Sequence, residues 1–140
     1  MHSEEPGLKR SKRTIFFITG LILVLLLSLP VSGDEQTRIP TEITIALDPV
    51  NPTSGQGFFI NGNLSTEAGE PLGNKWVTLL STQAGATPGP FGYLTVTKTA
   101  LEGSFQFYRP PSSPPEDLKV IFKGLYGYNS SESNVVSAKK

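Results

Sequence analysis

Residues 42–64 read EITIALDPVNPTSGQGFFINGNL, and this stretch decides the fold class. Apolar residues recur at every second position on both sides of a turn-rich centre, as Ile43, Ile45 and Leu47 and then as Phe58, Ile60 and Leu64. Successive side chains of a strand point to opposite faces, so a period of two is typical of a strand with one buried face. The stretch therefore predicts strands over residues 42–47 and 57–64. Gly62 lies in the inward phase and predicts close approach of another backbone, or a bulge.

The same alternation continues to residue 138. It predicts five further strands over residues 75–81, 93–99, 104–108, 118–123 and 133–138. The apolar residues that we expect on their inner faces are Val77, Leu79, Leu94, Val96, Phe105, Phe107, Leu118, Val120, Phe122 and Val135. Residues 109–117 contain four prolines, which cannot donate ladder hydrogen bonds, so this run is not a central strand. Seven short strands at this spacing predict an all-β, Greek-key sandwich of two antiparallel sheets.

Several short motifs, in order, resemble those of prokaryotic extracellular Ig-like domains. They are Ser54-Gly55, Gly62-Asn63-Leu64, Gly69-Glu70-Pro71-Leu72, Val77-Thr78-Leu79 and Gly103-Ser104-Phe105-Gln106-Phe107. The resemblance implies a seven-stranded Ig-like β-sandwich over residues 42–138 and an extracytoplasmic structural or adhesive role. A carboxypeptidase-regulatory-like or transthyretin-like sandwich has a very similar pattern, so both strand topologies stay open. The turn over residues 100–103 and the long loop over residues 83–92 depart from the family pattern.

The first 33 residues have the pattern of an export signal. The basic run KRSKR at residues 9–13 precedes the apolar run 15–29, and Pro30 and small residues follow. The apolar run is shorter than the roughly 20 residues that a spanning helix usually needs. We therefore predict an N-terminal hydrophobic helix that is a signal peptide cleaved after Gly33, with an uncleaved membrane anchor as the alternative. Either form exports the remainder, in which residues 34–41 are a linker.

Composition excludes several classes of function. The chain has no cysteine, and its only histidine is His2, so a thiolate metal site and a Ser-His-Asp triad are both excluded. The net charge is zero, which argues against a nucleic-acid partner. We expect no catalysis and no cofactor. We also expect no metal site, because the chain lacks an Asp-x-Asp-x-Asp run and its carboxylates fall in the expected loops, at Asp48, Glu67, Glu70, Glu102, Glu116 and Asp117.

Four aromatic residues are candidate contacts for a ligand or partner: Trp76, Tyr93, Tyr126 and Tyr128. Trp76 alternates with Val77 and so points away from the predicted core. An exposed tryptophan can stack on a sugar ring or anchor a protein partner. Tyrosines in loops at one end of a sandwich can form a contact surface. The alternative is that a loop covers Trp76 and that Tyr128 packs at the rim or as a tyrosine corner.

Two sequons begin at Asn63 and Asn129 and are candidate glycosylation sites in an exported chain. The sequence as a whole predicts a non-enzymatic, exported or cell-surface module with a structural, adhesive or protein-interaction role. The alternative is a small carbohydrate-binding module that uses exposed aromatic residues. The expected partner is a protein or polysaccharide of the cell envelope, together with the membrane itself if the N-terminal segment is not cleaved.

Overall fold

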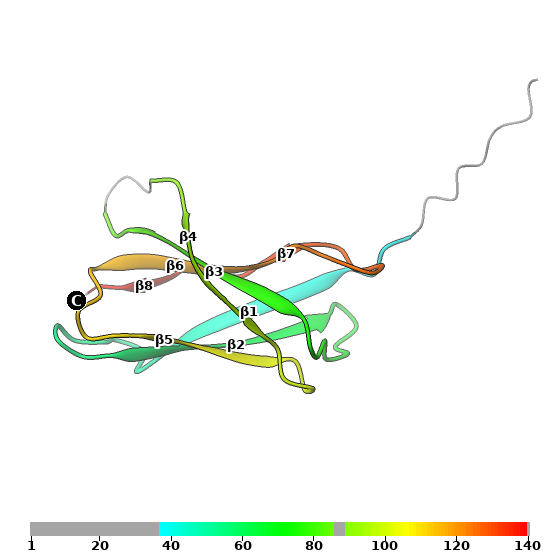
Figure 1. The fold of residues 1–140 in the computed structure, drawn as a ribbon, viewed down its shortest axis with the longest axis horizontal. Coiled ribbons are helices and arrows are strands. Elements are labelled where there is room, and N and C mark those ends of the chain that lie inside the picture. Colours follow the sequence, from blue (N-terminus) through cyan, green and yellow to red (C-terminus); the bar gives the residue numbers. More distant parts are fainter. Residues whose placement is uncertain (1–36, 86–88, 140) are drawn as a thin grey trace, which may run out of the picture. The chain divides into compact units, whose positions relative to one another are not determined.

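The computed structural model describes residues 37–85 and 89–139, so the predicted signal peptide or anchor over residues 1–33 lies outside the described residues. The described residues form strands, turns and loops, and among them no helix is long and apolar enough to cross a membrane. The strands, shown in Figure 1, are β1 (Thr41–Asp48), β2 (Phe58–Thr66), β3 (Trp76–Gln83), β4 (Gly92–Lys98), β5 (Ser104–Arg109), β6 (Glu116–Phe122), β7 (Ser131–Glu132) and β8 (Val136–Ala138).

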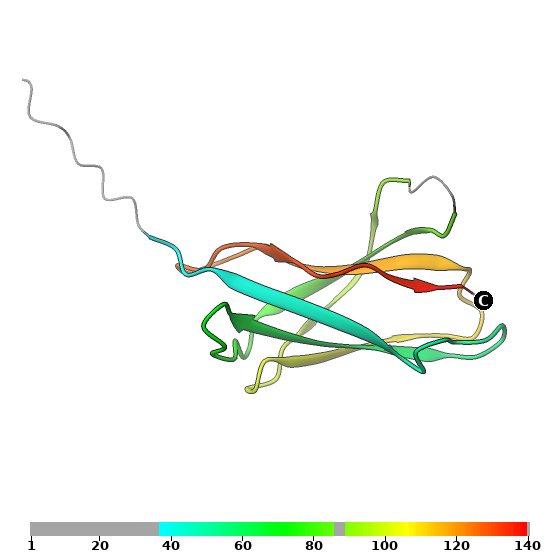
Figure 2. The same cartoon turned by 180° about the vertical axis from the view of Figure 1, so that it is seen from behind.

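These strands form two antiparallel sheets. One sheet has the order β1-β2-β5, and the other has the order β4-β3-β6-β7, with β8 also paired to β6. Figures 1 and 2 show the two sheets as separate layers, with β1, β2 and β5 in one layer and β3, β6 and β8 in the other. The all-β class and the two antiparallel sheets that the alternation predicts are therefore confirmed.

The hydrophobic core fills the space between the layers. Strand β1 alternates buried and exposed residues along its whole length, and β6 alternates buried and half-buried ones. The buried apolar residues are Ile43, Ile45, Leu47, Phe58, Ile60, Leu64, Leu72, Val77, Leu79, Phe105, Phe107, Leu118, Val120, Phe122 and Ala138. Burying each large member of this set stabilises the fold by about 1.5–3 kcal/mol. The predicted inner faces are confirmed for β1, β2, β3, β5 and β6.

Gly62 makes room for an aromatic ring in this core. It lies in register with Ile45 of β1 and with Phe105 of β5. A Cβ atom added to Gly62 would lie 2.1 Å from the Cζ atom of Phe105, so the phenyl ring occupies the space of the missing side chain. The expectation of a close backbone or a bulge at Gly62 is therefore wrong in both forms. The approaching group is a side chain and not a backbone, and the register of β1, β2 and β5 continues through Gly62 without a bulge.

The prediction for β4 is wrong at Val96, which was expected in the core. Val96 lies opposite Thr78 and is 41% exposed. The register between β3 and β4 shifts at Leu79 and Leu80, as in a β-bulge. An extra residue in one strand reverses the alternation beyond it. Leu94 therefore still packs against the core, whereas Val96 joins the outer face of the sheet.

The last predicted strand, over residues 133–138, is wrong in its bounds. Strand β8 covers only Val136–Ala138 of it, and the short strand β7 (Ser131–Glu132) lies before the predicted range, so the described residues form eight strands and not seven. Ser133 lies in the gap between β7 and β8 and stays bonded to β6. Its N–H donates to the carbonyl of Val120 at 2.8 Å, and its hydroxyl accepts from the Val120 N–H at 2.9 Å. Val135 is 53% exposed, which contradicts its predicted core position, and Val136 packs against the core in its place.

The side chain of Asn134, which lies between β7 and β8, connects the two sheets. The Asn134 Oδ1 atom accepts from the Ile45 N–H at 3.0 Å, and its Nδ2 atom donates to the Ile45 carbonyl at 3.0 Å. The amide thus satisfies both backbone groups of Ile45 at the edge of the three-stranded sheet. Backbone groups left unpaired at an edge are a liability for aggregation. Asn134 therefore pairs these backbone groups of the edge strand β1 and links β1 to the other sheet.

An ion pair between Arg109 and Glu116 joins the two sheets where the chain passes from β5 to β6. Arg109 ends β5 and Glu116 begins β6, and the guanidinium binds the carboxylate through two hydrogen bonds, Nε to Oε1 at 2.7 Å and Nη2 to Oε2 at 3.0 Å. The Glu116 side chain is only 4% exposed. The expectation that Asp48, Glu116 and Asp117 lie in loops is wrong, because β1 includes the first and β6 begins with the other two.

Candidate functional site

Trp76 begins β3 and lies on the outer face of the five-stranded sheet. It is 56% exposed, whereas Val77 beside it is fully buried, so the predicted outward direction is confirmed. Lys98 ends β4 directly opposite, and its Nζ atom lies 4.8 Å from the centroid of the indole ring. This distance is that of a cation–π contact. Lys98 therefore contacts the indole on this face, and more than half of the tryptophan remains open to solvent.

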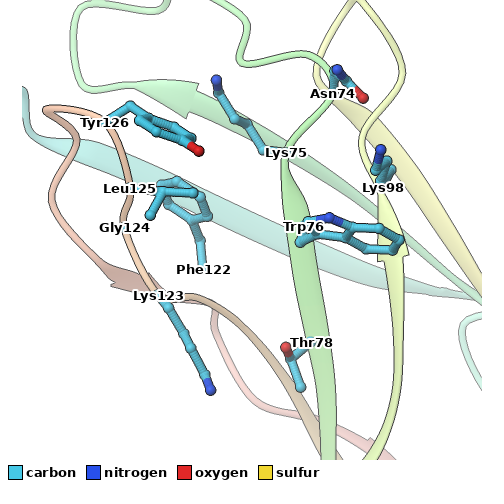
Figure 3. Close-up of a pocket in the computed structure, with 10 residues that line it drawn as sticks. All are labelled: Asn74, Lys75, Trp76, Thr78, Lys98, Phe122, Lys123, Gly124, Leu125 and Tyr126. Atoms are coloured by element: carbon cyan, nitrogen blue, oxygen red, sulfur yellow. The ribbon is translucent and has the colours of Figure 1, made fainter.

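A hollow opens next to Trp76 because β3 and β6 separate there. Their pairing ends at Thr78 and Ile121, and a continued register would place Trp76 opposite Lys123. The chain instead turns away after β6, with a positive φ of 75° at Gly124 and of 50° at Tyr126. The resulting hollow has a volume of about 510 Å³. We call it the Trp76 hollow; it is lined by Asn74, Lys75, Trp76, Thr78, Lys98, Phe122, Lys123, Gly124, Leu125 and Tyr126 (Figure 3).

The lining of the Trp76 hollow is aromatic and cationic. Figure 3 shows the indole of Trp76 directed towards Lys98 on one side of the hollow and the ring of Tyr126 on the other. Tyr126 is 84% exposed. Three of the ten lining residues are lysines, and none carries a carboxylate. The hollow therefore combines exposed aromatic surface with positive charge, and no lining residue is negatively charged.

No ion pair among the described residues neutralises these lysines. The two pairs found in residues 37–85 and 89–139 are Arg109–Glu116 and Lys119–Glu132. Lys75 instead lies over the ring of Tyr128, with its Nζ atom 5.3 Å from the centroid. An aromatic ring attracts an ammonium group but carries no net charge that could neutralise it. No carboxylate of the described residues therefore forms an ion pair with the lysines of the hollow.

The structure brings together only two of the four aromatic residues predicted as contacts, Trp76 and Tyr126. Tyr128 is half-buried and packs against the hydrophobic core, as in the rim packing considered as its alternative role. Tyr93 is 66% exposed but lies opposite Leu80, at the other end of β4 from Lys98. Tyr93 does not line the Trp76 hollow.

Sequence reasoning missed a second exposed aromatic pair. Phe59 of β2 and Tyr108 of β5 lie opposite each other on the three-stranded sheet, with ring centroids 5.2 Å apart. Both are exposed, at 38% and 56% respectively. The alternation contains the signal, because Phe59 directly follows the inward-pointing Phe58 and Tyr108 directly follows the inward-pointing Phe107. Neighbouring residues of a strand point to opposite faces, so Phe59 and Tyr108 are expected to point outward. The lysines of the Trp76 hollow had no comparable signal.

The two sequons lie on the surface. Asn63 is exposed on β2, in the outward phase that was expected, and Asn129 is exposed shortly before β7. Glu102 lies close to Asn63. Its carboxyl group accepts hydrogen bonds from the Glu102 backbone N–H and from the Ser104 hydroxyl, and these bonds hold the pKa of the carboxyl group below the ordinary value. Both asparagines are therefore placed where a glycan would meet solvent.

Within the described part of the chain, no group of three or more histidine, cysteine, aspartate or glutamate residues is arranged to hold a metal ion. The chemistry that the Trp76 hollow offers is therefore stacking, hydrogen bonding and charge attraction from Trp76, Thr78 and the lysines. No family model, curated protein or solved structure matches this chain.

Proposed function

We propose that this chain is an exported, non-enzymatic Ig-like module that adheres to cell-envelope material through the Trp76 hollow. The observation that carries this proposal is the 56% exposure of Trp76 beside a hollow of about 510 Å³. Large aromatic residues are well buried on average, and tryptophan is enriched among the residues that carry most of the energy of an interface. An indole beside Lys98 that is left open to solvent is suited to such a contact.

The order of the strands supports the Ig-like assignment. In Ig-type sandwiches strands A, B, E and D form one sheet and strands C, F and G form the other, to which the variable type adds C′ and C″. Here β1, β2 and β5 correspond to A, B and E, while β3, β6 and the divided pair β7 and β8 correspond to C, F and G. Strand β4 pairs with β3 and takes the place of strand C′. The described residues contain no counterpart of strand D, and the order of the other strands supports an Ig-like topology.

Export and the absence of catalysis are supported by the sequence. A basic run, an apolar run and small residues occur in that order over residues 9–33. The part that would be exported contains neither histidine nor cysteine, so the common nucleophile-and-base pairs cannot form in it. An adhesive module needs only a stable scaffold and an exposed contact surface, and both are present.

The proposal predicts that the full chain is retained on envelope material and that Trp76→Ala reduces this retention about tenfold or more, because interface tryptophans often contribute 2 kcal/mol or more. The measurement is the fraction of purified chain that co-sediments with washed envelopes of the producing cell. Tyr108→Ala is the matched control, because Tyr108 is also 56% exposed and lies on the opposite sheet. Equal retention of the wild-type and Trp76→Ala chains would refute the proposal, and loss in Tyr108→Ala alone would move the contact to the three-stranded sheet.

A further inference from the structure

The charge of the Trp76 hollow points to the class of ligand. Lys75, Lys98 and Lys123 line it, and neither a lining carboxylate nor an ion pair in the described residues balances them. The chain as a whole has zero net charge, so this cluster is a local feature and not part of a general basic surface. A site of one sign attracts ligands of the other sign. The ligand is therefore expected to carry negative charge.

The remaining groups point to a sugar. The half-exposed indole of Trp76 offers a flat apolar surface, and the hydroxyl of Thr78 and the amide of Asn74 offer hydrogen-bond donors and acceptors on the same lining. The volume of about 510 Å³ lies within the roughly 300–1,000 Å³ of small-ligand sites. This volume suits one or two sugar units. Stacking on an aromatic plane combined with hydrogen bonds to hydroxyls is the chemistry of carbohydrate recognition.

The position of the hollow argues against an acidic peptide. An extended peptide commonly binds by adding a strand to a sheet edge. The edge strand of the five-stranded sheet next to Trp76 is β4, and it contributes only Lys98 to the lining of the hollow. The rest of the lining comes from β3 and the two residues before it, and from the end of β6 and the segment that follows it. Its lining offers no row of free backbone groups from an edge strand. A chain of sugars, by contrast, can cross the face of the sheet with one unit in the hollow.

We propose that the Trp76 hollow binds a uronic-acid unit of an anionic polysaccharide, with the sugar ring against Trp76 and the carboxylate near Lys98 or Lys123. This inference rests on the proposed adhesive function and adds the ligand class to it. Lys98 ends β4 and Lys123 directly follows the end of β6, and Figure 3 shows the two side chains on opposite sides of Trp76. A carboxylate beside either ammonium group would gain a charge-assisted hydrogen bond, which is shorter and stronger than a neutral one.

The test is calorimetric titration of the full 140-residue chain in mild non-ionic detergent. The probes are oligosaccharides of galacturonate, alginate and hyaluronan, each compared with its carboxyl-reduced, neutral form. We expect at least one acidic probe to bind about tenfold or more tightly than its neutral form, because binding to a charged partner adds a charge-assisted hydrogen bond. Binding should weaken as salt rises from about 0.01 M to about 0.15 M, where the screening length falls from about 30 Å to about 8 Å.

Two variants assign this effect to the hollow. The double substitution Lys98→Gln and Lys123→Gln should raise the Kd about tenfold or more, and Trp76→Ala should do the same. The matched control is Lys119→Gln with Lys139→Gln, which removes the same number of charges from residues that do not line the hollow. A fall in affinity as large in the control as in the Lys98 and Lys123 variant would overturn the assignment to the hollow.

The remaining outcomes separate this inference from the proposed function. If no acidic oligosaccharide binds at millimolar concentration while envelopes still retain the chain through Trp76, the uronate inference is wrong and the adhesive function stands. Equal binding of acidic and neutral forms would refute the role of charge. Tighter binding of a poly-glutamate peptide than of every oligosaccharide would refute the sugar. Loss of both envelope retention and oligosaccharide binding would refute both proposals.

Discussion

Replacing Glu116 by alanine is expected to lower the free energy of unfolding by about 3–5 kcal/mol, because removing one partner of a buried ion pair leaves the other charge unpaired. The Glu116 side chain is 4% exposed and that of Arg109 is 18% exposed. Both guanidinium hydrogen bonds, at 2.7 and 3.0 Å, are lost together. The measurement is urea unfolding of residues 36–140, which form one compact unit of the chain.

A second ion pair of the same chain is the control. Lys119 and Glu132 are 2.8 Å apart, but the Glu132 side chain is 64% exposed. Exposed pairs contribute about 0.2–1 kcal/mol, so Glu132→Ala should change stability by less than 1 kcal/mol. The double variant Arg109→Met with Glu116→Leu should recover much of the loss, because apolar residues that replace a buried pair are often neutral or stabilising. A loss below 1 kcal/mol in Glu116→Ala would contradict the burial of the pair.

Gly103→Ala is expected to destabilise the fold by about 3–4 kcal/mol, through a strained backbone and a steric overlap together. Gly103 has a φ of 80°, a conformation that alanine adopts only at a cost. A Cβ atom at this position would lie 2.4 Å from the Leu64 carbonyl oxygen and 3.2 Å from the Leu72 nitrogen. Those two atoms are already hydrogen-bonded at 3.0 Å, so neither can move without weakening that bond.

The variant Gly69→Ala separates the backbone strain from the steric overlap in the stability loss expected for Gly103→Ala. Gly69 has a φ of 89°, but no atom lies within 4 Å of the Cβ position. Only the backbone cost of about 1–2 kcal/mol is expected there. The same urea unfolding experiment measures both variants. Equal losses of unfolding free energy in Gly69→Ala and Gly103→Ala would contradict the account, because they would show that the Leu64 carbonyl oxygen does not obstruct a Cβ atom at residue 103.

Most of the fold could be predicted because burial on one face imposes a period of two on a strand. The prediction holds for β1, where every second residue is buried. It is wrong at Val96, because a bulge reverses the phase and a single sequence has no signal for the extra residue. It is wrong at Val135, which lies outside β7 and β8 and directly follows Asn134, whose side chain is hydrogen-bonded to Ile45. Those bonds join residues far apart in the sequence.

Glu116 could have been placed correctly from the sequence. It has the same phase as Leu118, Val120 and Phe122, so it belongs on the inner face of β6. The prolines that precede it suggested a longer loop. A charged residue in the inward phase of a strand indicates a buried partner, and Arg109, at the other end of the proline-rich run, is the nearest cation that precedes Glu116 in the sequence.

The candidate site could be predicted only in part. The outward direction of Trp76 follows from its neighbour Val77 alone. The grouping of Trp76 with Tyr126 depends on the path of the chain after β6, which turns through positive φ angles at Gly124, Tyr126 and Gly127. The part played by Lys98 depends on the register of β3 with β4. Neither feature is local in sequence, so alternation could not reveal the Trp76 hollow.

Trp76 is the only tryptophan of the chain, so its fluorescence reports on the Trp76 hollow alone. The most direct test of the central claim is to follow this emission while envelope polysaccharide is added to the full chain, with binding measured in parallel by calorimetry. If the hollow is the binding site, the emission shifts to shorter wavelength as the indole leaves water, and it saturates at the same concentration as the heat of binding. Binding that is measured by calorimetry but leaves the emission of Trp76 unchanged would contradict the claim.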